Sequence, residues 1–234
     1  MRVGVVQSSF IPWRGYFDFI DNVDLFVFYD DIQYTDRDWR NRNKIKTQKG
    51  LDWLSVSVKY QKRSQLICET QIDNKTQWAL KQINKWKNEY RTAPYLDDVM
   101  YLLSDIDDCK EQTISSLNIK LIKRICKYLG IVTPMISSEE LELTGNKTDR
   151  LINLMQQVKG NIYLSGPSAD DYLDKELFKK AGVSLEYKSY EYPQYPQLWG
   201  DFEGAVTILD LIANCGAESK KYIHSIEPNL VIIE

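Results

Sequence analysis

The stretch Gln7 to Tyr34, QSSFIPWRGYFDFIDNVDLFVFYDDIQY, decides the fold that we expect for this chain. An apolar run, 3–6, precedes it, and a second apolar run, 25–29, lies inside it. Between the two runs, a turn around Pro12 leads into an apolar segment that we expect to be helical to about Asn22. Short β-branched or aromatic runs followed by polar residues are typical of buried parallel strands. The pattern predicts a right-handed strand–helix–strand unit, because parallel neighbours need a crossover connection.

Polar side chains follow both predicted strands. Gln7 comes directly after the first strand, and Asp30, Asp31 and Gln33 come after the second. The carboxyl ends of parallel strands meet at one edge of a sheet, where ligands bind. We therefore predict an active site at this edge, with Asp30 or Asp31 as the catalytic base. Adjacent side chains in a strand point in opposite directions, so one of the two carboxylates suffices. Gln7 and Gln33 are candidate polarising groups.

The middle of the chain is expected to form an insertion. Residues 53–59 alternate between polar and apolar, and we expect them to pair with 66–72 in a hairpin. Apolar periodicity predicts helices at 75–91, 95–106 and 111–129. We accordingly expect one α/β domain over 1–234, with a hairpin and helical insertion at 51–130.

The second half returns to alternating strands and helices. We expect strands at 131–136, 161–164 and 183–188, and helices at 145–160, 175–181, 204–215 and 217–225. This alternation predicts an α/β fold with a parallel-sheet, Rossmann-like (nucleotidylyltransferase-like) core.

Small and polar residues follow the strand predicted at 161–164. Ser165 and Gly166 can offer a hydroxyl and a backbone N–H to an anion. Ser168 and Asp171 have the spacing of a capping box, so a structural role and a ligand role stay open for both. We include all four among the candidate substrate-binding residues. Lys147 and Arg150 lie in the first turn of a predicted helix, where a cation is unfavourable unless an anion binds nearby.

A basic segment with interleaved aromatics, 37–49, follows the two carboxylates. Arginine suits bidentate contact with phosphate, and an aromatic ring can stack on a base or a sugar. A solvated loop is the simpler alternative. The candidate substrate-binding residues of this segment and of the preceding turn are Phe10, Trp13, Tyr16, Tyr34, Trp39, Arg40, Arg42 and Lys44.

The composition narrows the possible partners. The 234 residues are 43% hydrophobic and 27% charged, with a net charge of −3 and a pI near 5.4. That balance disfavours general binding to DNA, which needs a basic surface. No apolar run approaches the ~20 residues of a membrane span, and the sequence opens without a signal peptide, so we expect a cytoplasmic protein. The four cysteines form no C-x-x-C pair and are expected to be reduced thiols.

Several single residues have a plain structural explanation beside a functional one. His224 is the one histidine, and we expect it at the surface of the last helix rather than in catalysis. Cys215 is a conceivable acyl nucleophile, although burial near a helix end is the simpler expectation. The acidic run Asp105, Asp107 and Asp108 is expected to be a solvated helix end, and we predict no metal site.

The motifs assembled so far resemble those of the WbqC family. They are Q-x-x-F-x-P-W-x-G-Y-F (7–17), F-V-x-Y-D-D-x-Q-Y (26–34), W-R-N-R-N-K-I (39–45), Y-L-S-G-P-S-x-x-D-Y-L (163–173), Y-P-Q-L (195–198) and L-D-L-I-x-N-C-G (209–216). The resemblance spans nearly the whole chain. It implies a role in bacterial O-antigen or surface-polysaccharide biosynthesis, as a glycine-type aminoacyl transferase or acyl transferase acting on an amino sugar. The partners would then be a nucleotide-linked amino sugar and a small amino-acid or acyl donor.

The first turn also resembles, more loosely, the F-x-P-x-H-x-G-H turn of nucleotidylyltransferases and pantothenate-synthetase-like ligases. In those enzymes the two histidines hold ATP phosphates, whereas Trp13 and Tyr16 stand in their place here. Two alternatives therefore stay open. One is an ATP-dependent ligase or nucleotidylyltransferase with ATP and Mg²⁺ as cofactors, and the other is a non-catalytic sugar-nucleotide-binding protein.

Overall fold

A central, mostly parallel sheet organises the computed structural model, which describes residues 1–104, 106 and 111–234. Within these residues the sheet has six strands in the order β5-β2-β1-β6-β7-β8. All neighbouring pairs are parallel except β7 with β8, which are antiparallel. The strands are β1 (Arg2–Val6), β2 (Leu25–Phe28), β5 (Met135–Ser137), β6 (Ile162–Ser165), β7 (Ser184–Tyr187) and β8 (Leu230–Ile233). The predicted α/β class with a parallel sheet is confirmed.

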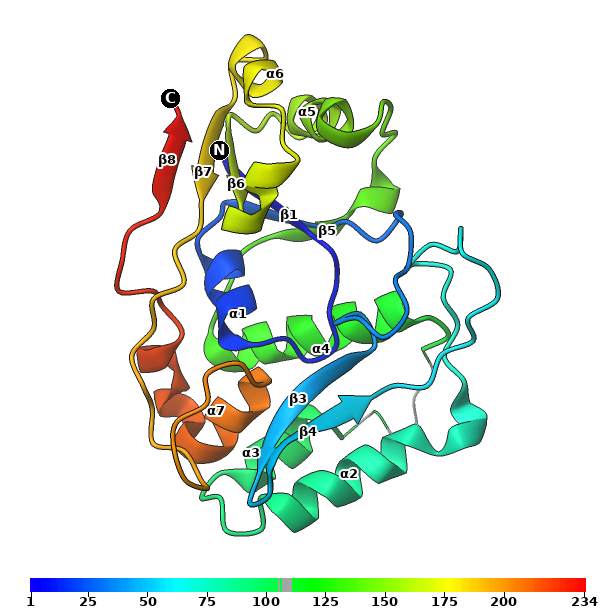
Figure 1. Cartoon of the computed structure of the whole chain (residues 1–234), viewed down its shortest axis with the longest axis vertical. Helices are drawn as coiled ribbons and strands as arrows, with labels where there is room; N and C mark the ends of the chain where they lie inside the picture. Colours follow the sequence, from blue (N-terminus) through cyan, green and yellow to red (C-terminus); the bar gives the residue numbers. More distant parts are fainter. Residues whose placement is uncertain (105, 107–110) are drawn as a thin grey trace.

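Helices cover both faces of this sheet (Figure 1). On one face lie α5 (Lys147–Gln157) and α6 (Lys175–Lys180), whose apolar residues share a buried cluster with β1, β6 and β7. On the other lie α1 (Arg14–Asp21) and α4 (Ile114–Leu129), within a second, larger cluster. The strands alternate between the two clusters, as a period of two requires. Phe26 and Phe28 point to the α1 side, and Val27 points to the α5 side.

The inserted hairpin differs from our expectation. β3 (Arg42–Thr47) pairs antiparallel with β4 (Gly50–Ser55), so the hairpin begins at Arg42. Residues 53–55 therefore pair mainly with β3 and not with the expected segment 66–72. An isolated bridge, Val58 with Ile72, joins those two expected partners. The turn closes at Gly50, whose φ of +106° favours glycine. Part of the basic segment that we expected to be a loop is therefore a strand.

Further helices surround the hairpin and pack beneath the sheet (Figure 1). They are η1 (Asn74–Thr76), α2 (Trp78–Glu89), α3 (Leu96–Leu102), α7 (Ile208–Cys215) and η4 (Gly216–Tyr222). Two short 3₁₀ turns, η2 (Ser138–Glu140) and η3 (Pro167–Asp171), follow β5 and β6. The helix expected to reach residue 106 ends at Leu102, and the helix expected at 217–225 is the 3₁₀ turn η4. The acidic run of Asp105, Asp107 and Asp108 lies outside the described residues.

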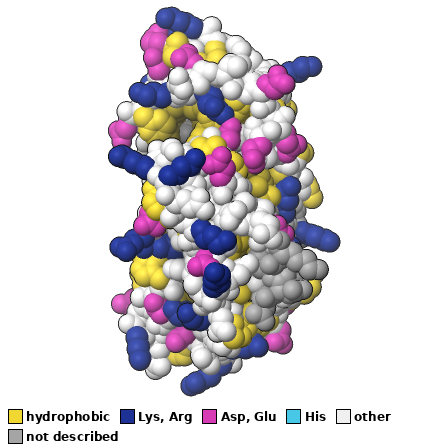
Figure 2. Space-filling model, turned by 90° about the vertical axis from the view of Figure 1, so that its right-hand side faces the viewer, with side chains coloured by type: hydrophobic (Ala, Val, Ile, Leu, Met, Phe, Trp, Pro, Cys, Tyr) yellow, Lys and Arg dark blue, Asp and Glu magenta, His cyan; other side chains and the backbone are white. Residues whose placement is uncertain are grey.

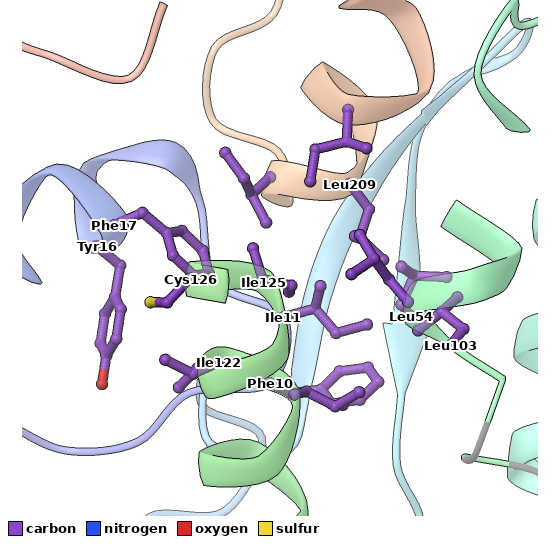
Figure 3. Close-up of a cluster of buried hydrophobic side chains, with 14 of the residues drawn as sticks. Phe10, Ile11, Tyr16, Phe17, Leu54, Leu103, Ile122, Ile125, Cys126 and Leu209 are labelled. Carbon is purple, nitrogen blue, oxygen red and sulfur yellow. The ribbon is translucent and has the colours of Figure 1, made fainter. Parts of the chain in front are cut away.

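The first turn inserts its side chains into the larger core cluster. Figure 3 shows Phe10 and Ile11 among Ile122 and Ile125 of α4, with Leu209 of α7 nearby. Phe10 is fully buried and meets Trp78 edge-to-face with ring centroids 6.4 Å apart. The turn is therefore held between sheet, insertion and C-terminal helices. None of the helices in the described part of the chain is long and apolar enough to cross a membrane.

Candidate functional site

A polar cleft of about 980 Å³ lies at the carboxyl edge of the sheet. The chain leaves β1 to one side for β2 and β5, then returns to the other side for β6 and β7. The sheet order therefore reverses between β1 and β6, which is where open α/β sheets form a ligand crevice. Its lining includes Gln7 after β1, Asp31 and Gln33 after β2, and Ser165, Gly166 and Asp171 after β6. The beginning of α5 adds Asn146, Lys147, Thr148 and Arg150. We call this cavity the polar cleft.

Asp31 is the carboxylate that lines the polar cleft. Its Oδ2 pairs with the guanidinium of Arg150, and its Oδ1 accepts a 2.6 Å hydrogen bond from the hydroxyl of Ser138. Arg150 also lies over the ring of Tyr29, with Cζ 5.6 Å from the centroid. These contacts fix the orientation of a carboxylate that stays partly open to solvent, at 19% exposed.

The Asp30 side chain, unlike that of Asp31, is fully buried. Its Oδ1 accepts a 2.8 Å hydrogen bond from the backbone N–H of Ser8, and its Oδ2 accepts one from the hydroxyl of Ser115 in α4. Each carboxylate oxygen thus has a partner inside the protein. Asp30 joins the end of β1 to the end of β2 and to the insertion, and it does not line the polar cleft.

A second cavity, of about 390 Å³, adjoins the polar cleft across Val6, which lines both. Five aromatic side chains form much of its wall, and we call it the aromatic pocket: Trp13, Tyr16, Phe19, Trp39 and Tyr190. Gly15 allows the Trp13 ring to lie against the start of α1, because a Cβ there would approach Trp13 Cζ2 to 2.4 Å. Glycine at position 15 therefore leaves the space that this ring occupies.

Arg40 connects the two cavities. It lines the aromatic pocket, and its Nη1 donates a 3.1 Å hydrogen bond to Gln7 Oε1 in the polar cleft. The Arg40 side chain is 11% exposed, and its Nε has no hydrogen-bond partner, with Asp38 Oδ2 4.0 Å away. The guanidinium therefore retains donors for an acidic ligand group.

The loop after β6 brings Ser165, Gly166 and Asp171 to the polar cleft. Gly166 has φ −79° and ψ 153°, which any residue adopts. A Cβ at this position would meet nothing closer than Tyr190 Oη, at 3.6 Å. Neither the backbone nor the packing therefore requires glycine here, and the missing side chain leaves room for a ligand to approach the backbone.

Several expected site residues lie elsewhere. Phe10 and Tyr34 are at most 1% exposed and belong to the core. Arg42 and Lys44 lie on β3 and line neither cavity. Arg42 Cζ is 4.1 Å and Lys44 Nζ is 5.5 Å from the ring centroid of Trp53. Ser168 is exposed and lines neither cavity, and η3 is capped by Gly166 with Pro167 next, so the predicted Ser168 cap is wrong. A proline fits the first turn because it needs no N–H partner there.

Polar residues that the sequence interpretation missed hold the site together from α4 and β3. Asn118 donates to the carbonyl of Arg40 at 2.8 Å, and Asn43 donates to the carbonyl of Ile11 at 2.7 Å. Both amides are at least 96% buried. The sequence did contain a signal for Asn118: Ser115 and Asn118 are polar residues on the apolar, buried face of α4.

Cys215 and His224 lie apart from the polar cleft. Cys215 is buried at the end of α7, as expected, and burial raises the pKa of its thiol to about 11. His224 lies beside a separate cavity, with its Nδ1 3.4 Å from Asp18 Oδ1 and its Nε2 3.6 Å from Asp21 Oδ2. Among the residues that the structure describes, no three His, Cys, Asp or Glu side chains gather closely enough to hold a metal ion.

This arrangement defines a mixed α/β protein with a polar cleft at the switch point of a mostly parallel sheet. The chain belongs to the WbqC-like protein family, whose model matches residues 7–222. It is also 46% identical over 225 residues to the uncharacterized protein Rv1507c of Mycobacterium tuberculosis, an alignment that covers 95% of this chain and 97% of the relative. No solved structure matches the chain significantly.

Proposed function

We propose that this WbqC-like protein is a transferase that forms an amide on the amino group of a nucleotide-linked sugar, using an aminoacyl or acyl donor. The observation that carries the proposal is the convergence of Gln7, Asp31, Gln33 and Ser165 on one cleft at the switch point of the sheet. Switch points of this kind are where α/β proteins bind nucleotides. The strand order, with β1 central and β6 beginning the second half, supports a Rossmann-like interpretation of the sheet.

The residues of the polar cleft can supply both the proton acceptor and the oxyanion donors that amide formation needs. The sugar nitrogen attacks the carbonyl carbon of the donor, and the Asp31 carboxylate accepts the proton that the nitrogen loses. Donors that stabilise the developing oxyanion would be the amide of Gln7, the hydroxyl of Ser165 and the N–H of Gly166. The leaving group of the donor departs with its bonding electron pair, and the amide remains on the sugar.

The electrostatics of the polar cleft suit a substrate with both an amine and acidic groups. Asp31 offers a negative charge to an ammonium group. Lys147 and Arg150 offer positive charge at the start of α5, where the helix dipole adds to it. The face shown in Figure 2 carries mixed charge, with Lys and Arg interspersed with Asp and Glu. An ion-rich small molecule therefore fits better than a polyanion.

Incubation of the purified chain with UDP- or dTDP-linked amino sugars and a panel of aminoacyl and acyl donors tests the proposal by mass spectrometry. We expect a sugar nucleotide heavier by one acyl group. The Asp31→Asn variant should give no such product while retaining the wild-type fold, and Asp36→Asn is a control on an exposed carboxylate outside both cavities. Absence of product with every donor, or full activity of Asp31→Asn, would overturn the proposal. A product that forms solely with ATP and Mg²⁺ would assign the protein to the ligases instead.

A further inference from the structure

The aromatic pocket has no part in the amide chemistry described above, yet it adjoins the polar cleft. Its volume, about 390 Å³, lies at the lower end of the ~300–1,000 Å³ typical of small-molecule sites. The geometry points to this pocket as the binding site of the nucleobase, with the diphosphate passing Arg40 and the sugar reaching Asp31. This inference rests on the proposed function, because it assigns the nucleotide part of the same substrate.

Fixed aromatic walls suit a planar ring. Trp13 lies against Tyr190 with ring centroids 5.3 Å apart and an interplanar angle of 56°, and against Tyr192 edge-to-face at 5.7 Å. Its position is further limited by contact with Gly15. A ring that is held before the ligand arrives loses little conformational entropy on binding, which favours stacking on a base.

Arg40 lies where the two halves of such a substrate would meet. Its guanidinium lines the aromatic pocket and at the same time contacts Gln7 of the polar cleft at 3.1 Å. The Nε atom is buried, forms no hydrogen bond and lies 4.0 Å from Asp38 Oδ2. A phosphate between base and sugar would pair with the terminal nitrogens of the guanidinium, because a guanidinium matches phosphate oxygens with parallel N–H donors. The backbone at Arg40 is itself held by Asn118 from α4.

The aromatic rings of the pocket wall predict weak discrimination between bases, because stacking tolerates different bases. The Asn43 amide adds no base readout, since its nitrogen donates to the carbonyls of Phe10 and Ile11 and its oxygen accepts from the N–H of Lys44. We expect UDP, dTDP and GDP to bind with similar affinity, and pyrophosphate to bind much more weakly.

Calorimetry with UDP and with pyrophosphate on the full chain tests this assignment. Loss of a stacking ring weakens base binding by about 5- to 150-fold, so Trp13→Leu should weaken UDP binding by that factor, and Trp13→Phe should restore most of it. Tyr101→Leu removes a ring that is 68% exposed and lies outside both cavities, and it serves as the control. Circular dichroism checks folding, and Tyr190→Leu replaces Trp13→Leu if the latter unfolds.

The outcomes separate this inference from the proposed function. Equal UDP binding by wild type and folded Trp13→Leu or Tyr190→Leu, or equal binding of UDP and pyrophosphate by the wild type, would overturn the base site even if amide product forms. UDP binding that depends on Trp13, with no amide product from any donor, would support the base site and overturn the transferase.

Discussion

Replacing Asp30 with asparagine should destabilise the protein, whereas the same change at Asp31 should leave its stability nearly intact. The two carboxylates are adjacent in sequence but differ in surroundings. Asp30 is fully buried between Ser8 and Ser115, and Asp31 lies at the cleft with 19% of its side chain exposed. The substitution keeps size and shape, so the difference measures the buried carboxylate itself.

The magnitude follows from two hydrogen bonds. A bond to a charged group contributes about 1.5–3 kcal/mol, and a neutral one about 0.5–1.5 kcal/mol. The amide oxygen of an asparagine can still accept from the N–H of Ser8. Its amide NH2 group then faces Ser115, whose hydroxyl can rotate to accept a hydrogen bond from it. Weakening both bonds by about 1–1.5 kcal/mol gives a loss of about 2–3 kcal/mol for Asp30→Asn. At Asp31 the partly open ion pair with Arg150 contributes about 1 kcal/mol or less, and the Ser138 hydroxyl can still donate to the asparagine oxygen, so the loss is smaller than at Asp30.

Urea denaturation followed by circular dichroism measures both values. A loss of about 2–3 kcal/mol lowers the unfolding midpoint by about 1 M at the slopes usual for proteins of this size. The double variant with Ser115→Ala provides a thermodynamic cycle, in which we expect a coupling of about 0.5–3 kcal/mol with Asp30. Equal midpoints for Asp30→Asn and Asp31→Asn, or the absence of coupling with Ser115, would refute the reasoning.

Further predictions follow from crowding and from burial. Gly4→Ala should cost about 1–3 kcal/mol in the free energy of unfolding, because its Cβ would approach Phe19 Cε1 to 2.3 Å, whereas Gly166→Ala should cost little and is the matched control. Thermal or urea denaturation distinguishes the two, and similar losses would contradict the packing of β1 on α1. Burial raises the pKa of Cys126 to about 12 and that of Cys215 to about 11, so both thiols are almost entirely protonated at pH 8. Peptide-level mass spectrometry should find both slow to react with iodoacetamide until urea unfolds the chain or the pH nears 11, and rapid native labelling would contradict their burial.

The parallel core was predictable because its strands are short apolar runs with polar ends. The first two strands and the helix between them agree with the expected ranges to within about two residues. The hairpin was not predictable by the same means, because charged residues outnumber apolar ones in 42–47 and conceal the alternation that buries Asn43 and Ile45. β8 was missed since 230–233 pairs at the edge of the sheet with its first residues exposed.

The sheet edge that holds the polar cleft was predictable, whereas the contacts made there were not. Strand ends located Gln7, Asp31 and Ser165 at one edge, but the period of two does not say which of Asp30 and Asp31 faces inward. Burial decides that, and burial depends on α4, which lies more than 80 residues further along the chain. The same long-range packing takes Phe10 into the core and leaves Trp13 at the pocket.

Two motifs of the family resemblance meet at one buried carboxylate rather than at the polar cleft. Asp210 of α7 accepts hydrogen bonds from the Tyr195 hydroxyl at 2.6 Å and from the Gln197 amide at 2.7 Å, and another from Tyr90. Burial raises the pKa of Asp210, and Lys46 of β3 donates to Gln197 at 2.9 Å. These motif residues join the C-terminal helix to the hairpin, so they serve the architecture.

The contacts made by α4 limit how the chain can be shortened. Its side chains supply a partner to Asp30 through Ser115 and support the backbone of Arg40 through Asn118. A shortened chain that kept the parallel strands and discarded residues 42–130 would lose the supports of both cavities along with the hairpin. Any test of ligand binding at this edge therefore needs the insertion to be present.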